Sequence, residues 1–148
     1  MIPHGLQIVT LRLGDEVHGY TSAWMTQVSF KPPLLVLGVR AESRSRQMME
    51  ESGVLCLHFL GKDQQEIAQS FFKPSQQAGD KLSGFEVTPG PETGCPVLTV
   101  ALAHAECRVL RVIEGGDHSI VVAEVLECVR HREGEPLLLS DTPWQYGG

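Results

Sequence analysis

Runs of apolar and β-branched residues recur along the 148-residue chain, and short turn-like segments separate them. Such runs are typical of β-strands. They cover residues 6–13, 34–40, 54–60, 97–114 and 119–132. The first run ends at Gly14-Asp15 and the pattern resumes at Val17, which predicts a hairpin whose second arm contains residues 21–33. The Gly-Gly-Asp-His segment 115–118 predicts a hairpin turn between the last two runs.

Two segments with helical features lie between these strands. Residues 43–53 open with a serine and close with a glycine, which favours a short helix with an N-cap and a C-terminal cap. Residues 62–72 repeat apolar positions one turn apart, and Asp63 and Glu66 have the spacing of a capping box. Pro74 follows and would end this second helix.

The order of these elements predicts a mainly β fold with inserted helices, an antiparallel barrel. Residues 75–96 are rich in Gly and Pro and predict a long surface excursion with a short strand at 85–87. No repeat or linker divides the chain, so residues 1–148 are expected to form a single domain. No GxGxxG follows a predicted strand, which disfavours a Rossmann fold.

Composition and charge limit the functions that this fold can serve. The net charge of −6 disfavours a general nucleic-acid surface, because phosphate contacts require many Lys and Arg side chains. No apolar run reaches membrane-spanning length, and the residues after Met1 do not resemble a signal peptide. Four widely spaced cysteines without a CxxC pair favour reduced thiols over disulfides or a metal site. We therefore expect a cytoplasmic protein that binds neither nucleic acid nor membrane.

The segment from residue 21 to residue 33 carries the most information about function. Thr21, Ser22 and Ala23 have little bulk on either face of a strand, so they leave space for a flat ligand. Trp24 either stacks on or edges a ring system, or it packs in the core. The Pro32-Pro33 pair would interrupt strand pairing before the next apolar run.

A second group of residues suits an anion. Arg40, Ser43, Arg44 and Ser45 place guanidinium groups, hydroxyls and unpaired backbone N–H groups at the start of the first predicted helix. Phosphate is favoured there by the helix dipole and by bidentate Arg hydrogen bonds. Alternatively, Ser43 is only an N-cap beside solvated arginines. Lys81, in the long excursion, either closes over this anion or is a surface lysine.

His118 occupies the turn between the two longest strands, where it either donates to a ligand or caps its own backbone. His104, Glu106 and His131 lack metal-ligand spacing and are expected to be structural or exposed. No nucleophile elbow, zincin motif or P-loop is present in the sequence.

The order and spacing of these segments resemble the flavin reductase-like family, the FMN-binding split barrels that include short NAD(P)H:flavin oxidoreductases and flavoredoxin. The resemblance spans nearly the whole chain. Its motifs are Thr21-Ser22-Ala23-Trp24-Met25-Thr26-Gln27-Val28-Ser29-Phe30, Pro32-Pro33-Leu34, Ser43-x-Ser45, Ser52-Gly53, residues 65–72 and Gly116-Asp117-His118-x-Ile120-Val121-Val122-x-Glu124-Val125. It implies an antiparallel FMN-binding split β-barrel.

The resemblance also implies which residues bind the cofactor. The isoalloxazine site would comprise Thr21, Ser22, Ala23, Trp24, Met25, Thr26 and Gln27, with Gln27 near the polar edge or the ribityl chain. Ser43 and Ser45, with Arg40 or Arg44, would hold the FMN phosphate, and Lys81 would reach it. These residue types suit those roles on chemical grounds as well.

By the same resemblance the protein is a homodimer with flavin near the interface, and His118 is the catalytic residue that approaches the flavin, from the partner subunit. The implied reaction transfers hydride from NAD(P)H to flavin, and the reduced flavin then serves a flavin-dependent oxygenase or another electron acceptor. Two alternatives remain open: a non-enzymatic FMN-binding electron carrier, and an interaction module without flavin. The tail Trp144-Gln145-Tyr146 would either cover the flavin or anchor a partner chain.

Overall fold

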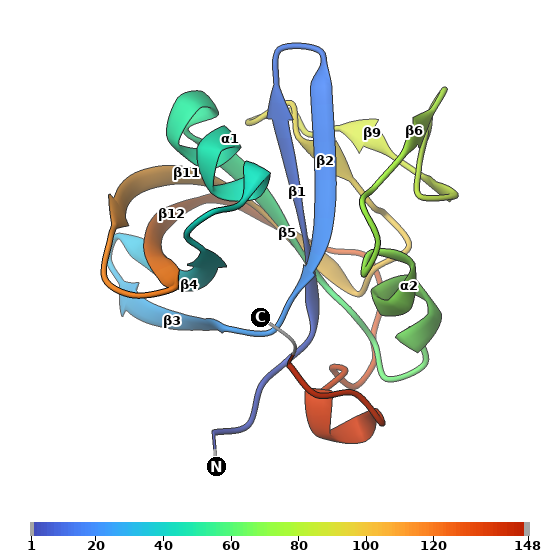
Figure 1. The fold of residues 1–148 in the computed structure, drawn as a ribbon. Helices are drawn as coiled ribbons and strands as arrows, with labels where there is room; N and C mark the ends of the chain where they lie inside the picture. The colour runs from blue at the N-terminus through green and yellow to red at the C-terminus, as the bar shows by residue number, and fades with distance from the viewer. Residues whose placement is uncertain (1, 147–148) are drawn as a thin grey trace.

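A seven-stranded sheet dominates the computed structural model, which describes residues 2–146 (Figure 1). Its strand order is β2-β1-β5-β11-β12-β4-β3, and every neighbouring pair is antiparallel. The strands are β1 (Gln7–Leu13), β2 (Glu16–Ser22), β3 (Met25–Phe30), β4 (Pro33–Arg40), β5 (Val54–Phe59), β11 (Ala103–Ile113) and β12 (His118–Arg130). The mainly β, antiparallel architecture predicted from the sequence is confirmed.

Residues 21–33 do not form one hairpin arm as predicted. β2 ends at Ser22 and pairs with β1, whereas β3 starts at Met25 and pairs with β4. The chain thus passes from one edge strand of the sheet to the other through Ala23 and Trp24. The single-arm prediction was wrong because alternation along a sequence does not reveal a change of pairing partner. This crossing places the small residues beside the end of β4.

Helix α1 (Arg44–Ser52) has the predicted caps. The Ser43 hydroxyl accepts a hydrogen bond from the Arg46 N–H at 3.1 Å, and Gly53, with φ +71°, donates its N–H to the Met49 carbonyl. Met48 and Met49 are buried against the sheet. α1 therefore has a fixed N-terminus next to the end of β4.

Helix α2 (Gln65–Ser70) is shorter than the predicted 62–72, and the predicted capping box is absent. Its N-cap is Gln64, whose side chain accepts a hydrogen bond from the Gly61 N–H. Asp63 instead pairs with Arg132, 3.0 Å away. The Asp63 carboxylate is thus used in a contact between distant segments rather than at the helix end.

The apolar core lies on both faces of β1. Val9 and Leu11 pack in a cluster with α1, and Ile8 packs in a second cluster with Phe71 and Leu98.

The excursion predicted from composition contains short strands rather than an irregular loop. They are β6 (Gln77–Ala78), β7 (Lys81–Leu82), β8 (Phe85–Glu86), β9 (Thr88–Pro89) and β10 (Pro96–Val97). A 3-10 turn, η1 (Leu139–Asp141), precedes the C-terminal tail.

Two sequence expectations are refined by this arrangement. The long run predicted at 97–114 is interrupted, because Val97 belongs to β10 and the sheet strand starts only at Ala103. Cys56, Cys95 and Cys107 are buried free thiols, and Cys128 is an exposed one. Within residues 2–146, none of the helices has the length and apolar character that crossing a bilayer requires.

Candidate functional site

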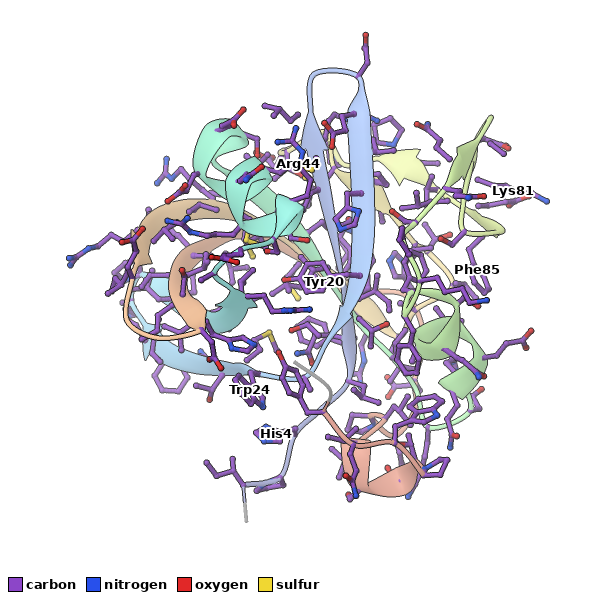
Figure 2. The ribbon with its side chains drawn as sticks, viewed as in Figure 1. His4, Tyr20, Trp24, Arg44, Lys81 and Phe85 are labelled. Atoms are coloured by element: carbon purple, nitrogen blue, oxygen red, sulfur yellow. The ribbon has the colours of Figure 1, made fainter. Side chains whose placement is uncertain are left out.

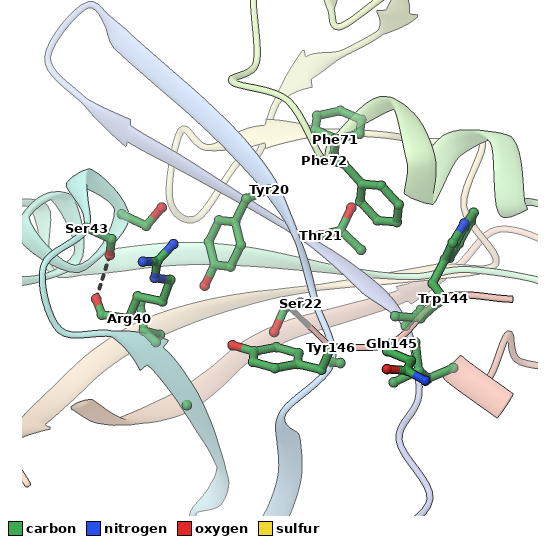
Figure 3. A pocket seen from close by; sticks show the side chains of 16 residues that line it. Tyr20, Thr21, Ser22, Arg40, Ser43, Phe71, Phe72, Trp144, Gln145 and Tyr146 are labelled. Carbon is green, nitrogen blue, oxygen red and sulfur yellow. Dashed lines mark hydrogen bonds between the residues drawn. The ribbon is translucent and has the colours of Figure 1, made fainter. Parts of the chain in front are cut away.

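A cavity of about 540 Å³ opens where the ends of β2 and β4, the start of α1, α2 and the C-terminal tail meet (Figure 3). Its volume lies in the range of cofactor sites. Six of the residues predicted to bind a cofactor line it: Thr21, Ser22, Ala23, Arg40, Ser43 and Ser45. Two segments that the sequence separates by about twenty positions are thus brought to one cavity, as the prediction requires.

One wall of the cavity consists of small side chains. Ser22 and Ala23 are buried, and the Thr21 hydroxyl donates a 2.6 Å hydrogen bond to the Ala68 carbonyl of α2. This bond fixes the end of β2 against α2. Because the side chains at this end are short, the wall leaves room for a flat group close to the backbone.

The opposite end of the cavity suits an anion. Ser43 donates from its hydroxyl to the Arg40 carbonyl at 2.7 Å, so the end of β4 is tied to the N-terminus of α1. Ser45 is buried in the first turn of this helix, and that turn carries no acidic residue. The helix N-terminus, two hydroxyls and the Arg40 guanidinium therefore converge where a phosphate is favoured.

Arg44 and Lys81, two further predicted phosphate ligands, do not line the cavity. The Arg44 guanidinium binds both carboxylate oxygens of Glu16 on the β1–β2 hairpin, at 2.6 and 3.0 Å, and this bond lowers the pKa of Glu16. Lys81 lies exposed on β7, at the outer edge of the excursion and far from Trp24 (Figure 2). The small hairpins of residues 77–86 hold it there. In this structure Arg40 is the cation at the anion end.

An aromatic group stands beside the cavity. The Trp24 ring lies over Gly38, where an added Cβ would come within 3.0 Å of the indole. It also contacts Tyr146, at a ring-centroid distance of 4.2 Å and an interplanar angle of 16°, and His118, at a ring-centroid distance of 4.7 Å. Trp24 is thus half-exposed beside the site rather than a core residue.

His118 joins this group through both ring nitrogens. Nδ1 lies 2.9 Å from the Asp117 carboxylate, and Nε2 lies 2.7 Å from the Tyr146 hydroxyl. Hydrogen bonding to His118 lowers the pKa of Asp117. Both Trp24 and His118 therefore contact the tail of their own chain.

The remaining predicted residues lie on β3 and do not line the cavity. Met25 packs against the core cluster under α1, whereas Thr26 and Gln27 are exposed on the edge strand. The Gln27 amide donates to the Ser29 carbonyl at 3.2 Å. The change of pairing partner at Ala23-Trp24 turns these side chains away from the wall formed by Thr21 to Ala23.

Comparison with known proteins identifies the family. The family model described as the flavin reductase like domain matches residues 1–146. The chain belongs to the flavin reductase-like family. It is 32% identical over 139 residues to an NADH-dependent FAD reductase of Streptomyces globisporus, across 93% of this chain and 76% of that protein. The reductase component of Thermus thermophilus 4-hydroxyphenylacetate 3-monooxygenase is 31% identical over 134 residues, across 90% and 82%.

Comparison with a solved structure also relates the chain to a flavin reductase. The NADH:FAD oxidoreductase of Streptomyces globisporus C-1027, in complex with NAD and FAD fragments, superposes with a TM-score of 0.84 at 29% identity. The match covers 99% of this chain and 87% of that one. The predicted split-barrel fold of the flavin reductase-like family is therefore confirmed.

Sequence reasoning missed Tyr20, the most distinctive polar group of this flavin reductase-like cavity. Its hydroxyl is buried and has no hydrogen-bond partner among the described residues. Burial raises the pKa of Tyr20, so the phenol stays protonated and is available as a donor. Figure 3 shows its oxygen pointing toward the space between Arg40 and Tyr146. Alternation along β2 places Tyr20 two residues before Ser22 on the same face, a signal that could have identified it.

These features fit a flavin. A buried hydroxyl without a partner is costly in a folded protein, and a ligand that accepts its hydrogen bond removes the cost. The small-residue wall suits the flat ring, and the anion end suits a phosphate. Phe71, Phe72 and Leu139 are among the apolar side chains of the lining. Their place there follows from α2 and η1 packing across the chain, which local sequence patterns do not reveal.

Proposed function

We propose that this protein binds FMN in the cavity and catalyses the reduction of flavin by NAD(P)H, supplying reduced flavin to a flavin-dependent oxygenase or another electron acceptor. The observation that carries the proposal is a single cavity, in a chain of this family, with a small-residue wall at one end and a helix N-terminus at the other. The similarity to an NADH-dependent FAD reductase and to the reductase component of a monooxygenase supports it.

Each group of side chains has a role in this proposal. When bound, the flavin accepts a hydride from the nicotinamide, so the protein needs no strong acid or base. Thr21, Ser22 and Ala23 leave room for the ring, and the Tyr20 hydroxyl donates a hydrogen bond to it or to its side chain. His118 and Trp24 orient the reacting face from the side. Catalysis then depends on positioning two rings face to face.

FMN rather than FAD is proposed because the cavity has one anion-binding end. Ser43, Ser45 and Arg40 converge on one place, which suits the single phosphate of FMN. With Lys81 far from this place in the structure, its predicted contact with the phosphate would require the excursion to move. FAD and riboflavin are the comparison ligands that test the choice.

The proposed homodimer has a candidate interface on the sheet. Large apolar side chains are exposed on β3, β11 and β12: Val28, Phe30, Leu110, Ile113, Ile120 and Leu126. Phe30 is 85% exposed, and so large an apolar side chain within an exposed apolar patch is unusual on a monomeric protein. A second copy of the chain that packs on this face would cover them, and it would lie next to Trp24 because β3 follows that residue directly.

The test begins with the absorption spectrum of the purified protein and a titration with FMN, FAD and riboflavin. Binding should be tightest for FMN, and NADH or NADPH should then be oxidised in the presence of excess FMN. Protein that neither binds flavin nor oxidises a nicotinamide nucleotide contradicts the proposal. A matched control is Lys62→Ala, which changes an exposed cation paired with Glu135, outside the cavity lining.

One observation favours the electron-carrier alternative. Tyr146 covers Trp24 at stacking distance, and a carrier would keep its flavin covered by side chains. Bound FMN without turnover of either nucleotide would establish the carrier. Turnover with excess flavin would establish the reductase.

A further inference from the structure

The phenol ring of Tyr146 occupies an aromatic slot formed by two residues that serve the proposed reaction, Trp24 and His118. It stacks on Trp24 at 4.2 Å, and its hydroxyl lies 2.7 Å from Nε2 of His118. The Tyr146 hydroxyl and Nε2 thus share one hydrogen bond, while Nδ1 on the opposite side of the ring lies 2.9 Å from the Asp117 carboxylate. The slot therefore provides one flat face and one hydrogen-bond partner.

These two features suit one particular class of ligand. Nicotinamide is a single six-membered ring with one polar substituent, as the phenol is, and it can use the same stacking face and the same histidine. The three fused rings of a flavin are too large for a slot filled by one phenol. Moreover, Tyr146 lines the cavity of about 540 Å³, which is open with the phenol in place, so a flavin in it would lie beside Tyr146.

The tail is anchored before Tyr146 rather than at it. Trp144 packs against the core cluster around Phe71 and meets Phe72 edge-on at 4.8 Å. Its N–H also donates to the Thr142 hydroxyl at 3.2 Å. Tyr146 is 36% exposed, and its ring and hydroxyl contact the Trp24 and His118 side chains. Rotation of the backbone after Trp144 would release the ring without disturbing the core.

We propose that Tyr146 competes with the nicotinamide ring for the slot formed by Trp24 and His118, and thereby sets the affinity for the nicotinamide nucleotide. The inference rests on the proposed reductase function. Each binding event would have to displace the phenol first, so the apparent affinity is lowered by the fraction of molecules in which the tail fills the slot. Tyr146 is in this sense a specificity-determining residue and takes no part in the chemistry.

The test measures NAD⁺ binding to the FMN-loaded protein and steady-state kinetics with NADH. Tyr146→Ala removes both the stack and the hydrogen bond, and we expect NAD⁺ to bind about threefold to tenfold more tightly. Tyr146→Phe keeps the stack and loses the hydrogen bond, so its affinity should fall between those of the wild type and Tyr146→Ala. KM for NADH should decrease in the same order, with kcat unchanged. Ser140→Ala, an exposed change earlier in the same segment, is the control.

The outcomes separate the inference from the function on which it rests. If NAD⁺ binds Tyr146→Ala as it binds the wild type, or more weakly, the tail does not compete and the inference is wrong while the reductase function stands. A fall in kcat for Tyr146→Phe would also contradict it, because the hydroxyl would then act in the reaction. If the wild type binds no FMN or oxidises no NADH, both proposals fail.

Discussion

The carboxylate of Glu106 accepts two hydrogen bonds from Thr93, one from the backbone N–H and one from the hydroxyl, each 2.8 Å long. It accepts a third from the backbone N–H of Glu92 at 3.0 Å. Glu106 is buried on β11, and a Cβ at Gly90 would collide with its carboxylate. One side chain of the central sheet thus anchors the excursion that the sequence predicted as a surface loop.

Removal of this carboxylate should destabilise the protein. Glu106→Ala leaves three partly buried donors without their acceptor, and we expect a loss of about 3 kcal/mol in the free energy of unfolding. Glu106→Gln keeps one acceptor oxygen and should lose less. Urea denaturation measures both. In the control Glu92→Ala, the backbone bond to Glu106 remains, so stability should hardly change; a loss equal to that of Glu106→Ala would contradict this account.

Tyr20→Phe should separate stability from flavin binding. The change removes a buried hydroxyl that lacks a protein partner, so the flavin-free protein should be unchanged or slightly more stable. Affinity for FMN should fall by about fivefold to tenfold, because the lost hydrogen bond contributes about 1 kcal/mol. Thermal unfolding without flavin and an FMN titration give the two values. Equal FMN affinity in wild type and variant would show that the hydroxyl does not contact the ligand.

Ser43→Ala and Ser45→Ala should both weaken FMN binding, but only Ser43→Ala should lower the stability of the protein. Ser43→Ala removes the N-cap bond to Arg46, so the free energy of unfolding should fall by about 1 kcal/mol, with a decrease in Tm of about 2–4 °C. Ser45→Ala removes no cap bond and should leave the Tm almost unchanged. Each variant should weaken FMN binding, and the double variant should weaken it most. Unchanged FMN affinity in the double variant would show that the phosphate does not bind at this end of the cavity.

The positions of the α1 caps and of several cavity-lining residues follow from local signals. The caps of α1 depend on residues within a few positions of each other, and so does the wall of small residues from Thr21 to Ala23. Ser43 and Ser45 follow directly from the helix N-terminus. Backbone propensity and side-chain size determine these features within one element, so the sequence contains them without knowledge of the fold.

The inaccurate or missed features depend on contacts between distant segments. Arg44 pairs with Glu16, 28 residues earlier, instead of lining the cavity, and no residue next to Arg44 in the sequence indicates that pair. The wall contributed by Phe71 exists because Gly19 lets the ring approach β2 closely. The position of Tyr146 depends on how η1 directs the tail back across the sheet. Such relationships arise from tertiary packing, which a single sequence does not specify locally.

The proposed dimer should depend on the apolar face of the sheet. Ile120, on β12, is half-exposed and lies between β4 and β11. Ile120→Lys would place a charge in the proposed interface, and we expect a monomer by light scattering where the wild type is a dimer. Ile2→Lys adds the same charge at an exposed position outside the sheet and should leave the dimer intact. A monomeric wild type would contradict the proposal directly.

Buried His58 should make the protein sensitive to acid. Its Nδ1 lies 3.2 Å from the Ile8 carbonyl and its Nε2 accepts the Leu98 N–H at 3.0 Å, which fixes a neutral ring. Burial lowers the pKa of His58 from 6.5 to about 3. The unfolded chain therefore binds a proton below pH 6.5 that the folded chain does not bind. Stability is full above pH 6.5 and decreases as the pH falls toward 3, by about 1.4 kcal/mol per pH unit from this group.

A histidine variant isolates this contribution from those of other groups. His18 and His104 also have pKa values lowered by burial, so they add to the acid sensitivity of wild type and variant alike. His58→Gln should be less stable than the wild type at pH 8, because it disturbs the bonds to Ile8 and Leu98. Between pH 6 and pH 4, however, its free energy of unfolding should fall less steeply than that of the wild type. The two slopes should differ by about 1.4 kcal/mol per pH unit, which is the contribution of His58. Urea denaturation at several pH values measures both slopes, and parallel curves would show that His58 is protonated in the folded protein.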